Sequence, residues 1–137
     1  MRKIDEIIVH CTATPEGRDF RASDIDRWHR QKGWSGIGYH YVVDLDGTVE
    51  AGRPEREAGA HCLKHNAHSI GVVYVGGLAS DGKTPKDTRT ARQKSALSKL
   101  LAGLKRRYPG ASIHGHRDFS AKSCPSFDAT SEYSDIK

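Results

Sequence analysis

The sequence has few cysteines and no long apolar segment. Its 137 residues contain three cysteines, at positions 11, 62 and 124, and this odd number at irregular spacing argues against a disulfide framework. We therefore expect free thiols or metal ligands in a reducing compartment. No run of about 18 consecutive apolar residues occurs, so no membrane span is expected.

A secretory signal is also missing from the first residues. The opening MRKIDEIIVHC passes directly into a strand-like segment, without the apolar core of a signal peptide. We expect synthesis and retention in the cytoplasm, unless another factor releases the protein. The chain has no internal repeat, low-complexity tract or linker, and its length fits one hydrophobic core, which predicts a single domain over residues 1–137.

Charge of one sign is in modest excess. The sequence has 22 Lys and Arg against 17 Asp and Glu, a net charge of +5, which favours an acidic partner such as nucleic acid, an anionic lipid surface or an acidic polymer. Lys99, Lys105, Arg106 and Arg107 lie on or near the polar side of a predicted helix, where solvation is the usual explanation. No recognised nucleic-acid-binding motif accompanies them, so we expect no nucleic-acid partner.

Apolar patterning predicts the strands of an α/β domain. Residues 69–77, SIGVVYVGG, are almost continuously apolar and indicate a central strand that is covered on both faces. An Asp-Gly dipeptide at 46–47 predicts a tight hairpin turn between two further strands. The expected strands are residues 4–11, 39–45, 48–51, 69–77 and 112–114.

Two helices are expected to pack on this sheet. Ser23 with Asp26 resembles a capping box, which predicts a helix of about three turns ending at Gly33. Thr90 with Gln93 predicts the start of a second, longer helix, in which apolar residues repeat at helical spacing until Pro109-Gly110. The polar segment 79–89 between them is predicted to be a loop.

A loop near the C-terminus, HGHRDFSAKSCPSFD at residues 114–128, collects side chains that bind metals. A catalytic zinc usually takes three ligands from His, Cys and carboxylates, and keeps a fourth position for water. His10 ends the first predicted strand, so His10, His116 and Cys124 form such a set if the first and last strands are neighbours. His114 shares a face with His116 in an extended chain. Taken alone, each of these residues is more often structural than metal-binding.

Four segments, at residues 9–14, 28–53, 59–77 and 115–128, resemble the zinc-dependent N-acetylmuramoyl-L-alanine amidases of the small phage lysozyme type. These amidases share a fold with the peptidoglycan recognition proteins. The segments follow the family's order and cover most of the chain. The resemblance implies a central mixed β-sheet of about five strands flanked by helices. It also implies that Zn²⁺ is held by His10, His116 and Cys124, with His116 chosen over His114 because it lies eight positions before the cysteine.

The same resemblance implies hydrolysis of the amide between N-acetylmuramic acid and L-alanine of peptidoglycan. It places a catalytic tyrosine at Tyr39 and a catalytic lysine at Lys122. We assign Lys122 to the oxyanion and Tyr39 to water deprotonation and proton transfer, although the sequence does not separate these roles. His61 and Asn66 are candidates for binding substrate.

A non-catalytic peptidoglycan-binding module is the alternative, motivated by the groove-like segment 59–69 and the shared fold. Non-catalytic relatives typically lack the cysteine ligand, so Cys124 favours an enzyme. We expect a monomer whose partner is the peptidoglycan substrate and which acts on the cell wall after release, as a phage or prophage lysin would.

Overall fold

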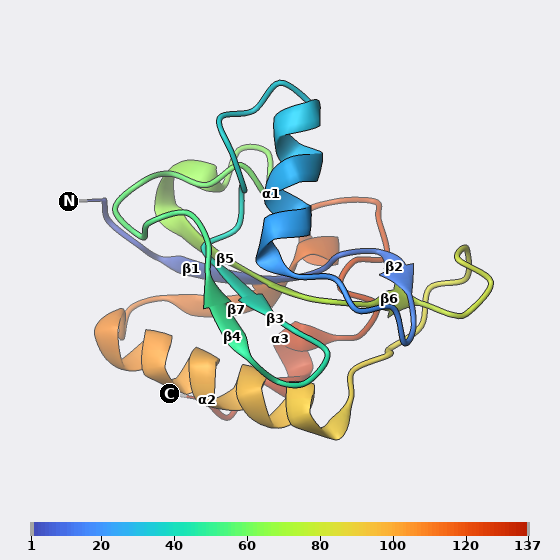
Figure 1. Ribbon diagram of the computed structural model, residues 1–137. Helices are drawn as coiled ribbons and strands as arrows, with labels where there is room; N and C mark the ends of the chain where they lie inside the picture. The colour runs from blue at the N-terminus through green and yellow to red at the C-terminus, as the bar shows by residue number, and fades with distance from the viewer. Residues whose placement is uncertain (1, 137) are drawn as a thin grey trace.

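A computed structural model describes residues 2–136 and has a five-stranded sheet at its centre (Figure 1). The strand order is β4-β3-β5-β1-β7. β1 runs parallel to both β5 and β7, β3 runs parallel to β5, and β4 pairs antiparallel with β3. The strands are β1 (Glu6–Cys11), β3 (Tyr41–Val43), β4 (Val49–Ala51), β5 (Ser69–Tyr74) and β7 (Ser112–Gly115). The predicted mixed sheet of about five strands is confirmed.

Helices cover both faces of the sheet (Figure 1). α1 (Ala22–Gln31) lies on one face, while α2 (Ala91–Arg107) and the short α3 (Ala129–Glu132) lie on the other. Successive strand residues point to opposite faces, so a strand between two helical layers is apolar on both sides. This explains the nearly continuous apolar run of β5. The α2 face buries Ile7, Val9, Ile70, Val72, Leu97, Leu101 and Leu104, and the α1 face buries Ile25, Val42, Val73 and Val75.

The start of α2 is fixed by the predicted capping box. Thr90 Oγ1 accepts a hydrogen bond from the Gln93 backbone at 3.1 Å, and Gln93 Oε1 accepts one from the Thr90 backbone at 2.9 Å. The buried Gln93 amide also donates to the Val75 carbonyl at 3.0 Å. The helix is therefore tied to the sheet at the same residue that caps it.

The predicted start of α1 at Ser23 and Asp26 is wrong. The N-cap is Arg21, whose backbone N–H is accepted by Asp24 Oδ2 at 2.9 Å. The next N–H, of Ala22, is accepted by Glu50 Oε2 of β4 at 2.8 Å. A contact with a strand distant in sequence thus begins the helix earlier than the local pattern indicates.

Several short elements were not predicted. β2 (Thr14–Pro15) and β6 (Gly77–Leu78) form a separate parallel pair, and η1 (Asn66–His68) and η2 (His116–Asp118) are single 3₁₀ turns. Elements this short contain no hydrophobic period that a sequence pattern can reveal. Of the helices described, none has the length and apolar character needed to cross a membrane.

A buried carboxyl lies where α1 meets the hairpin of β3 and β4. The side chain of Asp44 is fully buried, its Oδ2 accepts a hydrogen bond from Arg21 at 3.0 Å, and its Oδ1 has no partner within residues 2–136. Burial, followed by the neighbouring Glu50 carboxylate, raises the pKa of Asp44 to about 7. The folded protein therefore holds a proton at Asp44 that the unfolded chain releases near pH 4.

Replacing Asp44 by asparagine is expected to flatten the pH dependence of stability. Because the folded pKa is raised, Asp44 stabilises the fold most below about pH 4, and this contribution is lost as the pH rises through about 7. Asp44→Asn should therefore gain stability relative to wild type between pH 5 and pH 8. Urea unfolding across this range measures the difference, with the exposed Asp135→Asn as control. A difference that does not change with pH would contradict the assignment.

Candidate metal centre

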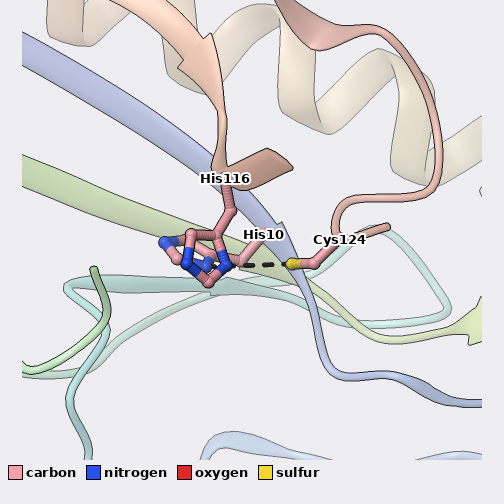
Figure 2. Close-up of side chains that lie close together, drawn as sticks. All are labelled: His10, His116 and Cys124. Atoms are coloured by element: carbon pink, nitrogen blue, oxygen red, sulfur yellow. Dashed lines mark hydrogen bonds between the residues drawn. The ribbon is translucent and has the colours of Figure 1, made fainter. Parts of the chain in front are cut away.

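Three side chains converge at the C-terminal ends of β1 and β7 (Figure 2). His10 lies near the end of β1, His116 begins η2 directly after β7, and Cys124 lies in the loop before α3. Their ligand atoms all lie within 4.8 Å of one another, with His10 Nδ1 and Cys124 Sγ 3.9 Å apart. β1 and β7 are parallel neighbours, so their ends meet at one edge of the sheet. The expected convergence is present.

The structure also separates His116 from His114. His114 Nε2 lies 2.8 Å from Ser112 Oγ, and its ring packs edge-on against Phe119. His114 is therefore engaged outside the cluster, whereas the His116 ring lies 4.5 Å from the His10 ring.

The donor set fits a zinc ion. Zinc bonded to nitrogen at about 2.0–2.1 Å and to sulfur at about 2.3 Å in tetrahedral geometry separates those ligand atoms by roughly 3.5 Å. The observed His10–Cys124 separation of 3.9 Å is a few tenths of an ångström wider. Imidazole and thiolate are both ligands that zinc takes in proteins, and a set of three protein ligands leaves a fourth position open, as in catalytic zinc sites.

Hydrogen bonds around His10 determine which of its nitrogens faces the cluster. Ser69 Oγ donates to the His65 carbonyl at 2.7 Å, so it accepts from His61 Nε2, 3.1 Å away. His61 Nδ1 is then unprotonated and accepts from His10 Nε2 at 2.8 Å. This leaves the lone pair of His10 Nδ1 directed toward Cys124, as a metal ligand requires.

Two glycines make room for His61 above the sheet. A Cβ built at Gly71 of β5 would lie 2.6 Å from the His61 ring, and one at Gly59 would lie at the same distance. Any side chain at Gly71 would displace the ring that holds His10. A glycine inside a strand often marks such a close approach.

Burial keeps the imidazoles neutral. Loss of solvent lowers the pKa of His10 well below its usual value, and it is also the largest cause that lowers the pKa of His116. The same effect, with a contribution from His40, lowers the pKa of His61 to about 3. Neutral imidazoles are the form that binds metals, so these residues need not lose a proton to bind an ion near neutral pH.

Cys124 is held in place from two sides. The backbone N–H of Cys11 donates to its Sγ at 3.1 Å, while Tyr74 Oη donates to the carbonyl of Pro125 at 2.6 Å. A hydrogen bond with the Cys11 thiol, followed by burial, raises the pKa of the Cys124 thiol, so metal binding must displace its proton. Behind this loop, Arg89 stacks on Phe127 at 3.5 Å.

The Arg89 side chain closes a network that the sequence analysis missed. Its guanidinium pairs with Asp87 and Glu132, at 2.8 Å and 2.6 Å, and donates to Tyr133 Oη at 2.8 Å. Only 1% of the side chain is exposed. The network joins the segment before α2 to α3, and so anchors the helix that follows the loop carrying Cys124. Glu132 and Tyr133 are distant from Arg89 in sequence, so no local pattern reveals these two partners.

The structure brings Tyr39 and Lys122 to the same site. The Tyr39 ring packs on the His10 ring with centroids 5.1 Å apart. Tyr39 precedes β3, which begins at Tyr41, so the expectation of a strand from residue 39 is wrong. Lys122 is exposed, and its charge contributes to lowering the pKa of His116. Tyr39 therefore packs against one residue of the metal cluster, and Lys122 lies two residues before another, Cys124.

His61 and Asn66 have partners inside the protein. Both ring nitrogens of His61 are engaged, with His10 and Ser69, and Asn66 Oδ1 accepts the backbone N–H groups of His61 and Cys62 at 2.8 Å and 3.0 Å. Asn66 thus closes the loop that positions His61. That these two residues bind substrate stays a prediction, whereas their structural contacts are evident.

Two imidazoles and a thiol at one end of a mixed sheet form a group that could hold a metal ion. The chain belongs to the N-acetylmuramoyl-L-alanine amidase family, whose sequence pattern matches residues 1–127.

Relatives agree with this membership. The chain is 42% identical over 127 residues to an endolysin of Klebsiella phage KP32, covering 93% of this chain and 83% of that protein. It is 30% identical to the amidase LysC from Clostridium intestinale, with a TM-score of 0.81 over 96% of this chain and 82% of that one. It also shares the fold of Drosophila PGRP-LB, at 24% identity and a TM-score of 0.80 over 98% of this chain and 82% of that one.

Proposed function

We propose that this chain is an N-acetylmuramoyl-L-alanine amidase. Its substrate is peptidoglycan, and it hydrolyses the amide that joins the lactyl group of N-acetylmuramic acid to the L-alanine of the stem peptide. The observation that carries the proposal is the cluster of His10, His116 and Cys124, whose ligand atoms lie within 4.8 Å of one another. Family membership supplies the substrate class.

Zn²⁺ is the proposed cofactor, held by His10 Nδ1, a ring nitrogen of His116 and Cys124 Sγ. When bound, zinc lowers the pKa of coordinated water to about 7 and polarises a carbonyl. The tautomer of His10 is maintained by His61, so His61 is a positioning residue. Cys11 contributes a backbone N–H that orients the Cys124 sulfur.

Tyr39 and Lys122 are the proposed catalytic residues beside the metal ligands. The Lys122 ammonium stabilises negative charge that develops on the carbonyl oxygen in the transition state. The Tyr39 hydroxyl assists water deprotonation and transfers a proton toward the leaving amine. Lys122 lies two residues before Cys124, so the loop that carries the sulfur ligand also holds the ammonium near the reacting carbonyl.

We also propose an oligomeric state, a site of synthesis and a site of action for the protein. All of the proposed site residues come from one chain, which supports action as a monomer with one amidase domain over residues 1–137. We place its synthesis in the cytoplasm and its action on the cell wall after release, since the relatives at 42% identity include phage endolysins. A non-catalytic binding module is less favoured, because the cysteine that such relatives typically lack is present at Cys124.

Mass spectrometry of digested peptidoglycan tests the reaction. We expect zinc-loaded protein to release stem peptides with a free L-alanine amino group and to leave glycan strands with intact lactyl groups. Sugar reducing ends should not increase, because no glycosidic bond is cut. Protein that sediments with cell walls without releasing peptides would instead support the binding module.

A further inference from the structure

A second cluster of metal-binding side chains lies outside the proposed active site. Glu6 is the first residue of β1, His65 is the N-cap of the 3₁₀ turn η1, and His68 is the last residue of that turn. Their ligand atoms all lie within 4.8 Å of one another. Glu6 is four residues before His10 on the same strand, so the two clusters lie at opposite ends of β1.

The separations within this cluster are close to those of a coordination sphere. Glu6 Oε1 lies 2.7 Å from His65 Nδ1 and 3.3 Å from His68 Nδ1. Tetrahedral zinc separates nitrogen and oxygen ligand atoms by roughly 3.3 Å. The Glu6–His68 pair already has this spacing, and the Glu6–His65 pair needs to open by about 0.6 Å. Asp5 Oδ1 lies 2.6 Å from His68 Nδ1, so a fourth ligand atom is within reach.

The backbone holds the three ligands in place. Residues three apart lie above one another in a 3₁₀ turn, so His65 and His68 point to the same side of η1. The parallel ladder pairs Glu6 with Ser69, and the Asp5 N–H donates to the His68 carbonyl at 3.0 Å. Phe119 stacks on the His65 ring at 4.0 Å and fixes its plane. The cluster is thus built from ordered elements and not from a mobile loop.

We propose that Glu6, His65 and His68 form a second binding site for a divalent transition-metal ion of the zinc type. Two imidazoles and one carboxylate favour Zn²⁺ and its neighbours over Mg²⁺ or Ca²⁺, which prefer oxygen ligands. The side chains are 16%, 24% and 37% exposed, so an ion can reach them from solvent. Asp5 supplies the remaining carboxylate.

An ion at this second site would stabilise residues that support the proposed active site, while lying outside that site. The turn that carries His65 and His68 also contains Asn66, which holds the backbone of His61, and the His65 carbonyl accepts from Ser69. His61 in turn holds the tautomer of His10. An ion at the second site therefore stabilises the loop that supports the first, and its ligands play no part in the reaction.

Protons compete with the metal at this site. The Asp5 carboxylate, followed in effect by Glu6, raises the pKa of His68, so without an ion His68 and these carboxylates form ion pairs. A metal must displace this proton, and its affinity falls as the pH is lowered.

Metal stoichiometry tests the proposal. Protein equilibrated with Zn²⁺ and desalted at pH 7.5 should retain two equivalents by mass spectrometry of the metal. His68→Ala and the more conservative Glu6→Gln should each retain one, as should Cys124→Ser, and the double variant His68→Ala with Cys124→Ser should retain none. His114→Ala is the matched control, because His114 is also a half-buried histidine beside a carboxylate, Asp118, and it should retain two.

The stoichiometries separate the two sites. One equivalent in wild type, or two in both His68→Ala and Glu6→Gln, would overturn the second site while leaving the amidase proposal intact. A loss of metal in Cys124→Ser together with full retention in His68→Ala would also overturn the second site and leave the amidase proposal intact. Thermal unfolding of Cys124→Ser with and without Zn²⁺ gives a further readout, because an ion that binds only the folded state must raise the Tm.

Discussion

Replacing Cys124 by serine is expected to lower kcat/KM for peptidoglycan at least about 10³-fold, because the activated nucleophile and the polarised carbonyl depend on the same ion. A serine hydroxyl is a far weaker zinc ligand than a thiolate, and only two imidazoles would remain. The variant should also retain one equivalent of zinc fewer than wild type. Peptide release and metal content measured on the same preparation test both parts.

Cys62→Ser is the matched control for this experiment. Cys62 is also a buried cysteine, with 3% of its surface exposed, but it does not belong to the metal cluster. Its replacement should leave the zinc content unchanged. Circular dichroism of both variants separates loss of the ligand from loss of the fold. Wild-type activity in Cys124→Ser would remove the proposed mechanism.

Replacing Lys122 by alanine is expected to lower kcat by about 10²–10³-fold, the usual effect of losing one donor to a developing oxyanion. Because this interaction strengthens only in the transition state, KM should change little. Zinc content should stay at the wild-type level, since Lys122 is not among the ligands. Steady-state kinetics on a soluble muropeptide separate kcat from KM.

Lys99→Ala is the control for charge alone. Lys99 is exposed on α2, on the opposite face of the sheet from α1, so its loss removes the same charge far from the metal cluster. If Lys122 acts only by attracting an acidic wall polymer, Lys122→Ala and Lys99→Ala should weaken binding to a similar extent. High salt should then abolish the difference between each variant and wild type. A rise in KM for Lys122→Ala without a fall in kcat would contradict the oxyanion role.

The sequence predicted the elements that have a strong local pattern. β5 and the buried part of β1 were evident because they are apolar on both faces, and α2 because its leucines repeat at helical spacing behind a capping box. The start of α1 was misplaced because Glu50, on a different strand, holds the N–H of Ala22. Local patterns contain no information about such a contact.

Some features of the candidate site were also predicted from the sequence, and others were not. The expected grouping of His10, His116 and Cys124 follows from parallel strand ends and from the family motif, and the structure places the three together. The role of His61 in holding His10 was not predicted, because it depends on the space above Gly71. One signal was present, since a glycine inside an apolar strand marks a close approach. The grouping of His65 and His68 with Glu6 was not predicted, because Glu6 lies on a strand distant in sequence.

The position of β1 between β5 and β7 in the sheet has a consequence for the timing of activity. Both of these neighbours come much later in the chain than β1. Such long-range pairing slows folding, and a nascent chain that has not reached Cys124 lacks the sulfur ligand. The proposed zinc ligand set can therefore be completed only after residue 124 has been synthesised.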